Sequence, residues 1–543
     1  MLGLMQDHPL LISQIIEYAA AYYPHVEIVS RTIEGPIHRY GYRDAHHRAK
    51  KVAEALLGLG IKLGDRVGTI AWNGYRHFEL YFGVSGIGAV LHTLNPRLSP
   101  EHVVYIANHA EDQIIFVDLN LLPIVEGVWD QLKTVKHVVV MTDREHMPTA
   151  SSIPDLLCYE ELIVGKPGTI RWPNFDERTA SSLCYTSGTT GNPKGVLYSH
   201  RSTLIHAMMF SNGAVIPLDP ETTILPVVPM FHANAWGLVY SGPMCGAGLV
   251  FPGAKLDGAS VYELLNNEQV TLSAGVPTVW LALLDYCEQN NLKMSTVKRT
   301  LIGGSAVPVS MISRFWREHE IEVIHGWGMT EMSPLGTSTR FNRGERNLPE
   351  DARFAITAKQ GRPVFGSEIK IVGDDGEDLP SDGSVSGNVV VRGPWIVSGY
   401  MRGEGKDKFG PGGWFQTGDV CRIEVDGSVV ITDRSKDVIK SGGEWISSIE
   451  IENLAMGCPG VAEAAVIGVS HPRWDERPLL IVVRRPDSNA TKNDILAFLE
   501  GKIAKWWTPD DVQFIDAIPH GATGKILKTK LRLRFKDYKL PTT

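Results

Sequence analysis

The chain has few cysteines, and their spacing excludes two common roles. Its 543 residues include six cysteines, none of which belongs to a C-x-x-C pair. The intervals between them suit neither a zinc site nor a disulfide framework. This usage predicts a reduced, cytoplasmic setting.

An excess of positive charge is also missing. The 53 Lys and Arg residues are outnumbered by 61 Asp and Glu residues, which gives a formal net charge of −8. Because a dedicated nucleic-acid binder carries a strongly basic surface, we expect no nucleic-acid partner.

One long uncharged stretch does not favour a membrane anchor. Residues 234–254 hold 21 positions without a charge, which is enough for a helix to cross a bilayer. Five glycines and two prolines interrupt this stretch, and both residue types disfavour a helix interior. A buried, broken core segment without stable membrane insertion is therefore expected. The N-terminus also lacks the basic start and cleavage site of a signal peptide.

The order of apolar segments predicts an α/β fold with several subdomains, because 543 residues exceed one core. Up to about residue 430, apolar runs alternate with helix-like segments, which is typical of largely parallel sheets. We read 66–71, 113–118, 137–142 and 270–274 as buried strands. After about residue 365, short strands with Asp-Gly turns predict a small β-rich subdomain of hairpins.

The C-terminal part reads as a separate α+β unit. It contains a predicted helix at 448–456, strands at 464–469 and 479–485, and a helix at 492–505. Its length of roughly a hundred residues is usual for an independent domain. We therefore expect an N-terminal domain of residues 1–433 and a C-terminal domain of residues 434–543.

A loop rich in glycine and hydroxyl groups is the strongest chemical signal. Eight of the eleven residues from Tyr185 to Gly195 are Gly, Thr, Ser or Lys. Glycines let backbone N–H groups approach a phosphate, the hydroxyls add donors, and Lys194 adds a cation. Pro193 stands where a Walker A loop requires Gly, so this is a different motif. A tight surface turn is the alternative, and the density of these residues favours phosphate binding.

Further segments complete a pattern that spans nearly the whole chain. They are residues 229–237, 274–279, 303–306, 326–331, 413–419, 433–437 and 518–526. Together with the loop, they resemble the motifs of the adenylate-forming superfamily, which includes acyl-CoA synthetases, firefly luciferase and peptide-synthetase adenylation domains. The resemblance implies a large N-terminal domain of two α/β subdomains plus the small β-rich subdomain, and a small, mobile α+β C-terminal domain.

By this resemblance, the loop and the 326–331 segment would bind ATP. Trp327 would stack on adenine, Thr330 would contact the α-phosphate, and Glu331 would help to bind Mg²⁺ with Thr186 as the second metal ligand. An aromatic face suits a purine, and a hard carboxylate suits Mg²⁺. The nucleotide-binding set also includes Ser187, Gly188, Thr189, Thr190, Lys194, Gly304, Ser305, His325, Gly326, Gly328 and Met329.

The remaining motifs supply charged groups. Asp419 and Arg434 would contact the ribose, the carboxylate as an ionised acceptor. Lys436 falls at the family's hinge position. Lys525 would bridge the substrate carboxylate and the α-phosphate, where negative charge develops. The family often has Lys-Thr or Arg-Thr before that lysine, whereas this chain has His520 and then Gly521; the lysine stays in register, and only the approach of the loop is affected.

Other residues bear on the acyl group and CoA. His232 would lie beside the reacting carboxylate, although a lone histidine is more often a core residue. The segment 440–447 is similar to bacterial medium- and long-chain fatty-acyl-CoA ligases and to methylmercaptopropionate-CoA ligase, and glycines near residue 443 would let the pantetheine arm pass. The predicted acyl and CoA channel consists of Trp236, Gly303, Trp395, Gly443, Glu444 and Trp445.

The resemblance implies an ATP-dependent acid–CoA ligase that works through an acyl-adenylate, with Mg²⁺ as cofactor, ATP and CoA as co-substrates, and a homodimeric state. The acid stays open between a short- or medium-chain fatty acid, a methylmercaptopropionate-like acid and a long-chain fatty acid. The alternatives are an adenylating enzyme that passes its product elsewhere and a catalytically silent nucleotide- or acyl-binding regulator. The sequence stops about eighteen residues after Lys525, which favours free CoA over a carrier domain.

Overall fold

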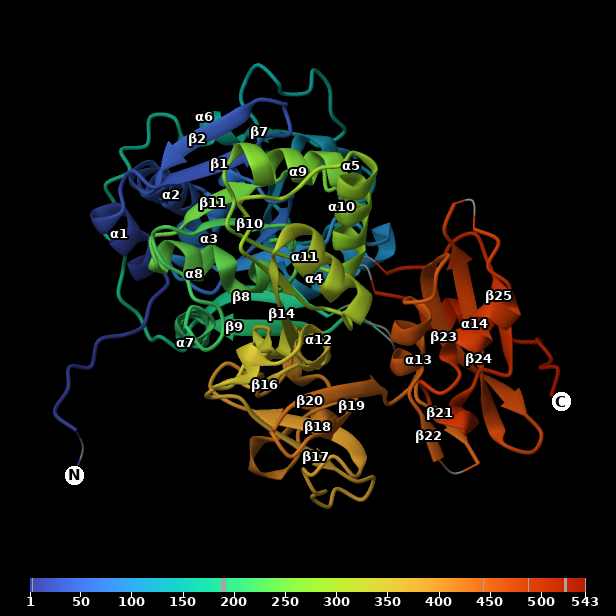
Figure 1. Ribbon diagram of the computed structural model, residues 1–543. Coiled ribbons are helices and arrows are strands. Elements are labelled where there is room, and N and C mark those ends of the chain that lie inside the picture. Colours follow the sequence, from blue (N-terminus) through green and yellow to red (C-terminus); the bar gives the residue numbers. More distant parts are fainter. Residues whose placement is uncertain (2, 187–191, 443, 487, 522–524, 543) are drawn as a thin grey trace.

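The computed structural model describes residues 1, 3–186, 192–442, 444–486, 488–521 and 525–542. Two large sheets with their helices form the N-terminal body, and a smaller antiparallel sheet adjoins it. A C-terminal unit, drawn in orange and red, lies beside both (Figure 1). The predicted α/β class, with a large N-terminal and a small C-terminal domain, is confirmed.

The first large sheet is parallel except at one edge. Its order is β7 (Leu157–Cys158), β6 (His137–Val140), β5 (Asp112–Val117), β3 (Arg66–Ile70), β4 (Val90–Leu94), β8 (Ala180–Tyr185) and β9 (Gly195–Ser199). β8 and β9 form the antiparallel edge, with Tyr185 opposite Gly195. This hairpin therefore brackets the glycine-rich loop. The strands read as continuous apolar runs because parallel strands are buried on both faces.

The second large sheet has a parallel centre and antiparallel edges. Its order is β16 (Arg362–Pro363), β15 (Leu335–Ser338), β14 (Glu322–Gly328), β13 (Arg299–Ile302), β12 (Leu272–Gly275), β10 (Thr223–Pro226), β11 (Gly248–Phe251), β1 (Glu27–Arg31) and β2 (Ile37–Gly41). The helices of the N-terminal body are α1 (Ser13–Tyr22), α2 (Tyr42–Gly58), α3 (Tyr75–Ser85), α4 (Pro100–Ala110), α5 (Leu122–Glu126), α6 (Tyr159–Ile163), α7 (His200–Phe210), α8 (Leu238–Met244), α9 (Gly258–Asn267), α10 (Pro277–Gln289), α11 (Val309–His319) and α12 (Glu350–Ala358).

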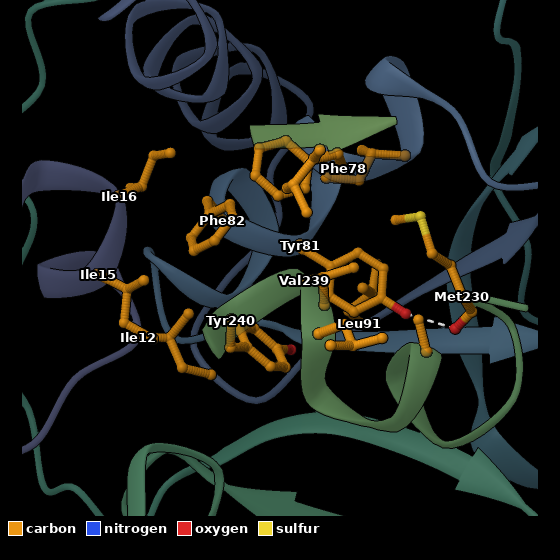
Figure 2. Packing of buried hydrophobic residues seen from close by; sticks show 14 of the residues in the cluster. Ile12, Ile15, Ile16, Phe78, Tyr81, Phe82, Leu91, Met230, Val239 and Tyr240 are labelled. Atoms are coloured by element: carbon orange, nitrogen blue, oxygen red, sulfur yellow. Dashed lines mark hydrogen bonds between the residues drawn. The ribbon is translucent and has the colours of Figure 1, made fainter. Parts of the chain in front are cut away.

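One hydrophobic core joins the two large sheets. It contains residues of both sheets, such as Leu91 and Leu249, and every residue of α3 is buried. Figure 2 shows Phe78, Tyr81 and Phe82 of α3 packed beside α1 and α8. The two charged residues of α3 are paired, as buried charges must be: Arg76 with Glu34 and Glu160, and Glu79 with Arg48. Because the core is shared, the two sheets form one rigid support for the loops at their edges.

The antiparallel sheet confirms the predicted hairpins. It runs β17 (Glu368–Val372), β18 (Ser386–Arg392), β19 (Phe415–Ile423) and β20 (Val429–Arg434). The C-terminal unit follows, with β21 (Ile439–Ser441), β22 (Glu444–Ile446), α13 (Ser448–Ala455), β23 (Val461–His471), β24 (Asp475–Arg484), α14 (Lys492–Leu499), β25 (Asp511–Phe514) and α15 (Lys528–Arg534). Its own core includes Ile451, Val466 and Leu480.

Buried polar contacts connect the end of β20 to the C-terminal unit. Oδ2 of Asp433 accepts hydrogen bonds from the backbone N–H and the hydroxyl of Ser448, at 2.9 and 2.6 Å. Lys528 donates to the same hydroxyl and lies 2.7 Å from Glu452. Since Lys528 begins α15, these contacts also fix where the nearby Lys525 lies.

The structure confirms one further sequence prediction and corrects another. Residues 234–254 form a broken core segment as expected, with α8 and β11 separated by a turn. The helix predicted for 492–505 was too long, because α14 ends at Leu499 and Gly501 adopts a left-handed φ of +74°. In the part of the chain that the structure describes, no helix is long and apolar enough to cross a membrane.

Candidate active site

A cavity of about 470 Å³ brings most of the predicted site residues together. This volume lies within the range of ligand pockets. The predicted residues that line it are Thr186, Lys194, His232, Trp236, Gly303, Gly304, Gly326, Trp327, Gly328, Met329, Thr330, Glu331, Arg434, Lys436 and Lys525. They come from both large sheets, from β20 and from the C-terminal unit.

Some predicted residues lie outside the described residues. These are Ser187, Gly188, Thr189 and Thr190 of the glycine-rich loop, together with Gly443 and the side chain of Glu444. The described ends of the loop are joined: the Lys194 N–H donates to Oγ1 of Thr186 at 3.2 Å, and the Thr186 N–H donates to the Lys194 carbonyl at 3.0 Å.

Among the residues whose side chains are described, five predicted ones do not line the cavity: Ser305, His325, Trp395, Trp445 and Asp419, which lies behind the lining residues Trp327 and Arg434. Ser305 is exposed, and Trp445 lies on β22 opposite Lys440. His325 is buried with Nδ1 3.2 Å from the Thr357 carbonyl oxygen, and burial lowers its pKa to about 4. Trp395 is a core residue whose indole N–H donates to the Leu335 carbonyl at 2.8 Å. In this arrangement, neither His325 nor Trp395 presents its side chain to a ligand in the cavity.

Asp419 organises one end of the cavity from behind its wall. Its Oδ2 accepts the indole N–H of Trp327 at 2.9 Å, and its Oδ1 lies 2.7 Å from Nε of Arg434. Asp419 itself is only 3% exposed. The register of β19 and β20 places Asp419 directly opposite Arg434, so the hairpin builds the ion pair. One buried carboxylate thereby orients an aromatic face and a cation.

The backbone beside Trp327 leaves no room for side chains. A Cβ on Gly328 would lie 1.7 Å from the Pro334 carbonyl oxygen, and one on Gly336 would lie 2.9 Å from the Trp327 ring. Close backbone approach of this kind requires glycine. The glycines on either side of the indole therefore fix its position in the cavity wall.

Glu331 is held by Tyr400, a residue that the sequence motifs do not reveal. The Tyr400 hydroxyl donates to Oε1 of Glu331 at 2.6 Å. Nζ of Lys194 lies 5.7 Å from the centroid of the Tyr400 ring. Burial raises the pKa of Glu331, while the hydrogen bond from Tyr400 and the positive charges of Arg434 and Lys525 oppose that rise. Tyr400 thus links the acidic side chain to the end of the glycine-rich loop.

Few of the described side chains in the cavity could bind a metal ion, so a metal there would take most of its ligands from a substrate and from water. Within the described residues, no group of three or more His, Cys, Asp or Glu side chains could hold a metal ion. Glu331 contributes one carboxylate to the cavity, and Thr186 contributes one hydroxyl. Such a set suits Mg²⁺, which keeps several waters and uses one or two carboxylates plus phosphate oxygens.

Lys525 enters the cavity from the C-terminal unit. Burial and the positive charge of Arg434 lower its pKa, Asp419 and Glu331 oppose that fall, and the resulting pKa is about 8. Its backbone is fixed by a hydrogen bond of 2.7 Å from the Gly521 N–H to its carbonyl. His520, where the sequence departs from the family pattern, pairs with Glu463 at 2.6 Å, so the departure leaves Lys525 at the cavity.

The other end of the cavity is apolar. Burial lowers the pKa of His232 to about 4, with a smaller contribution from Lys525, so this imidazole is neutral at neutral pH. Beyond it the wall is formed by Phe210, Val215, Ile216, Val228, Phe231, Val276, Val279 and Trp236. Of these, Phe231, Trp236, Val276 and Val279 lie in segments that the sequence motifs mark, whereas Phe210, Val215 and Ile216 follow no motif.

A cavity with an aromatic face, an arginine and a lysine at one end and an apolar wall at the other suits an enzyme that joins a nucleotide to an organic acid. Residues 16–401 match the family described as AMP-binding enzyme, and residues 450–525 match its C-terminal domain. The chain belongs to this family of adenylate-forming enzymes, in its acyl-CoA synthetase branch, and is an AMP-forming ligase.

Full-length relatives and a solved structure agree with this assignment. A 3-methylmercaptopropionyl-CoA ligase of Ruegeria lacuscaerulensis is 49% identical over 99% of this chain and 99% of its own length. A medium-chain-fatty-acid–CoA ligase of Ectopseudomonas oleovorans is 46% identical over 99% and 98%. The crystal structure of an anthranilate CoA ligase in complex with anthranoyl-AMP aligns with a TM-score of 0.87 at 26% identity, covering 98% of this chain and 99% of that one.

The surroundings of Lys525 predict an unusual titration. With a pKa of about 8, the amine is a cation at pH 7 and loses its proton as the pH rises through 8, well below an exposed lysine. Nuclear magnetic resonance of ¹³C-methylated lysines, with Lys525→Arg to assign the signal, measures this value in the nucleotide-free protein. Asp419→Asn is expected to lower the pKa further, because the carboxylate stabilises the cation. A Lys525 signal that titrates with the exposed lysines would contradict this electrostatic description.

Proposed function

We propose that the chain uses ATP to activate a short- or medium-chain fatty acid, or a thioether acid such as 3-methylmercaptopropionate, and transfers the acyl group to CoA. The observation that carries the proposal is one cavity with Trp327, Arg434 and Lys525 at one end, the first two held by Asp419, and an apolar wall at the other. The names of the two full-length relatives support the choice of acid.

The nucleotide would lie against Trp327, with its ribose at Asp419. Both oxygens of Asp419 already have a protein partner, but an ionised carboxylate offers about four lone-pair sites. Two sites therefore remain for the ribose hydroxyls, and Arg434 would contribute a further donor. Met329 and Thr330 would follow the nucleotide towards its phosphates, and Lys194 would meet them at the end of the glycine-rich loop.

In the first half-reaction, a carboxylate oxygen of the acid forms a bond to the α-phosphorus while the bond to pyrophosphate breaks. Lys525 would hold these two anions together, because it is a cation below about pH 8 and lines the cavity that would receive both. His232, being neutral, can lie beside the carboxylate without competing for its charge. Positioning and preorganised charge of this kind are the main sources of catalysis in phosphoryl chemistry.

The proposal includes Mg²⁺, which Glu331 and Thr186 would hold. When bound, this ion offsets the negative charge of the phosphates. The Tyr400 hydroxyl holds the carboxylate of Glu331 through its hydrogen bond of 2.6 Å.

For the second half-reaction, we propose a boundary between residues 1–433 and 434–543 and a rotation about Lys436. The rotation would withdraw Lys525 and bring the hairpin of β21 and β22, with Gly443, Glu444 and Trp445, to the site for CoA. The thiolate then forms the thioester while the bond to AMP breaks. Exposed Lys436 lies two residues after the end of β20, close to an element boundary as expected of a hinge.

The choice of acid rests on the aromatic wall. Trp236 and Phe231 close the apolar end, and a thioether sulfur gains roughly 0.3–1.5 kcal/mol from contact with an aromatic ring. A homodimer and a cytoplasmic location complete the proposal, on the resemblance to bacterial fatty-acyl-CoA ligases and on the free cysteines.

A panel of acids tests the substrate. The acids of the panel are propionate, 3-methylmercaptopropionate, hexanoate, octanoate and palmitate. We expect their kcat/KM values to differ, with the highest value for an acid whose chain has three to eight carbons or equivalent atoms. Each buried methylene contributes about 0.8 kcal/mol, so the preference is expected to rise roughly fourfold per carbon until the pocket is full. A maximum at palmitate establishes a long-chain ligase, and AMP release without acyl-CoA overturns the ligase.

The role of Lys525 is tested by separating the two half-reactions. Lys525→Ala is expected to slow adenylation at least about 100-fold, while thioester formation from supplied acyl-AMP stays within about threefold of wild type. Lys530→Ala, an exposed lysine on α15, is the matched control and is expected to change neither step. Equal losses in both half-reactions would contradict the assignment.

A further inference from the structure

A left-handed turn follows His232. Five consecutive residues have positive φ: Ala233 (44°), Asn234 (53°), Ala235 (49°), Trp236 (56°) and Gly237 (83°). Residues other than Gly, Asn and Asp rarely adopt this backbone conformation, because their Cβ atom approaches the following carbonyl oxygen. A run of this length persists only where surrounding contacts hold it in place, and such runs gather at functional sites.

The side chain of Asn234 supplies such contacts. Its Nδ2 donates to the Ser182 hydroxyl at 3.0 Å, and its Oδ1 accepts from the Tyr81 hydroxyl at 3.2 Å and from the Cys184 thiol at 3.6 Å. Asn234 is 4% exposed. The Tyr81 hydroxyl also points to the Met230 carbonyl, which accepts from it (Figure 2). Both amide atoms of Asn234 are thus fixed to rigid elements.

These partners belong to the part of the fold that carries the phosphate end of the cavity. Ser182 and Cys184 lie on β8, which ends at Tyr185, directly before the cavity-lining Thr186. The turn itself carries Trp236 and follows His232, which line the acyl end. The amide of Asn234 therefore connects the two ends of the cavity through buried hydrogen bonds.

The turn has little freedom to shift. A Cβ on Gly237 would lie 2.7 Å from the His206 ring, and one on Gly303 would lie 3.4 Å from the Trp236 ring. The indole is thus seated between the turn and the end of β13. Any displacement of the turn moves the indole along the acyl end of the cavity.

We infer that Asn234 is a positioning residue that sets acid specificity by holding Trp236 and His232 in register with β8. Among the described residues, Asn234 is not one that lines the cavity, so it acts through its neighbours. The inference rests on the proposed function, since it concerns the acid that this site would activate.

The variant Asn234→Gly tests the side chain of Asn234 while preserving the left-handed backbone conformation. Glycine tolerates the left-handed conformation, so this variant removes only the amide. We expect kcat/KM for the preferred acid to fall roughly 10- to 100-fold, chiefly through KM of the acid, because small misplacements carry costs of this size. The contrast between the best and worst acids of the panel is expected to shrink, while KM for ATP stays within about twofold.

Ser182→Ala provides a second test that leaves the turn sequence intact. It removes the partner of Nδ2 and is expected to flatten the acid profile in the same direction. The double variant is expected to be no worse than Asn234→Gly alone, since both remove one interaction. Ser273→Ala is the control: it removes a buried hydrogen bond of 3.2 Å to Thr300 and is expected to leave the acid preference unchanged.

The outcomes are distinguishable. A wild-type acid profile in Asn234→Gly, or in Ser182→Ala should the first variant fail to fold, overturns the inference. The inference is also overturned if the KM values for acid and for ATP rise equally and in step with a fall in Tm. Such a result indicates only a structural role for Asn234. A wild-type protein that forms no acyl-AMP with any acid overturns the proposed function instead.

Discussion

The cavity depends on one buried carboxylate. Asp419 accepts from the indole of Trp327 on β14 and pairs with Arg434 on β20, so it joins the second large sheet to the antiparallel sheet at the point where the chain leaves for the C-terminal unit. A buried charge is costly unless it is paired and hydrogen-bonded, and here both oxygens are engaged. The same charge raises the pKa of Lys525 against the effect of burial. Trp327, Asp419, Arg434 and Lys525 are therefore one electrostatic unit.

The remaining groups divide the cavity by charge. His232 is kept neutral by burial, whereas Lys525 keeps a pKa of about 8 because two carboxylates face it. The positive charge therefore concentrates where anionic groups would meet, and the acyl end stays uncharged. An apolar tail and a polyphosphate can occupy such a cavity together without either being placed in an unsuitable environment.

Local patterns predicted the parts of the site that lie in single segments. Asp419 and Arg434 each belong to a motif, but the strand register that pairs them emerges only in the structure, because no strand was predicted over residues 415–423. Tyr400 was missed because its link to Glu331 spans 69 positions, and a lone tyrosine carries no local signal. Trp395 was expected in the channel by resemblance to the CoA-ligase branch, yet its indole N–H donates to a carbonyl inside the core. The end of α14 was missed because the helical pattern of the sequence continues past the glycine that stops the helix.

The central claim is that acid and ATP react with each other before CoA takes part. Exchange of labelled pyrophosphate into ATP measures this step directly, in the absence of CoA. The structure predicts exchange that requires both Mg²⁺ and the acid and that does not require CoA. Exchange without acid, exchange only with CoA, or release of ADP in place of AMP would contradict it.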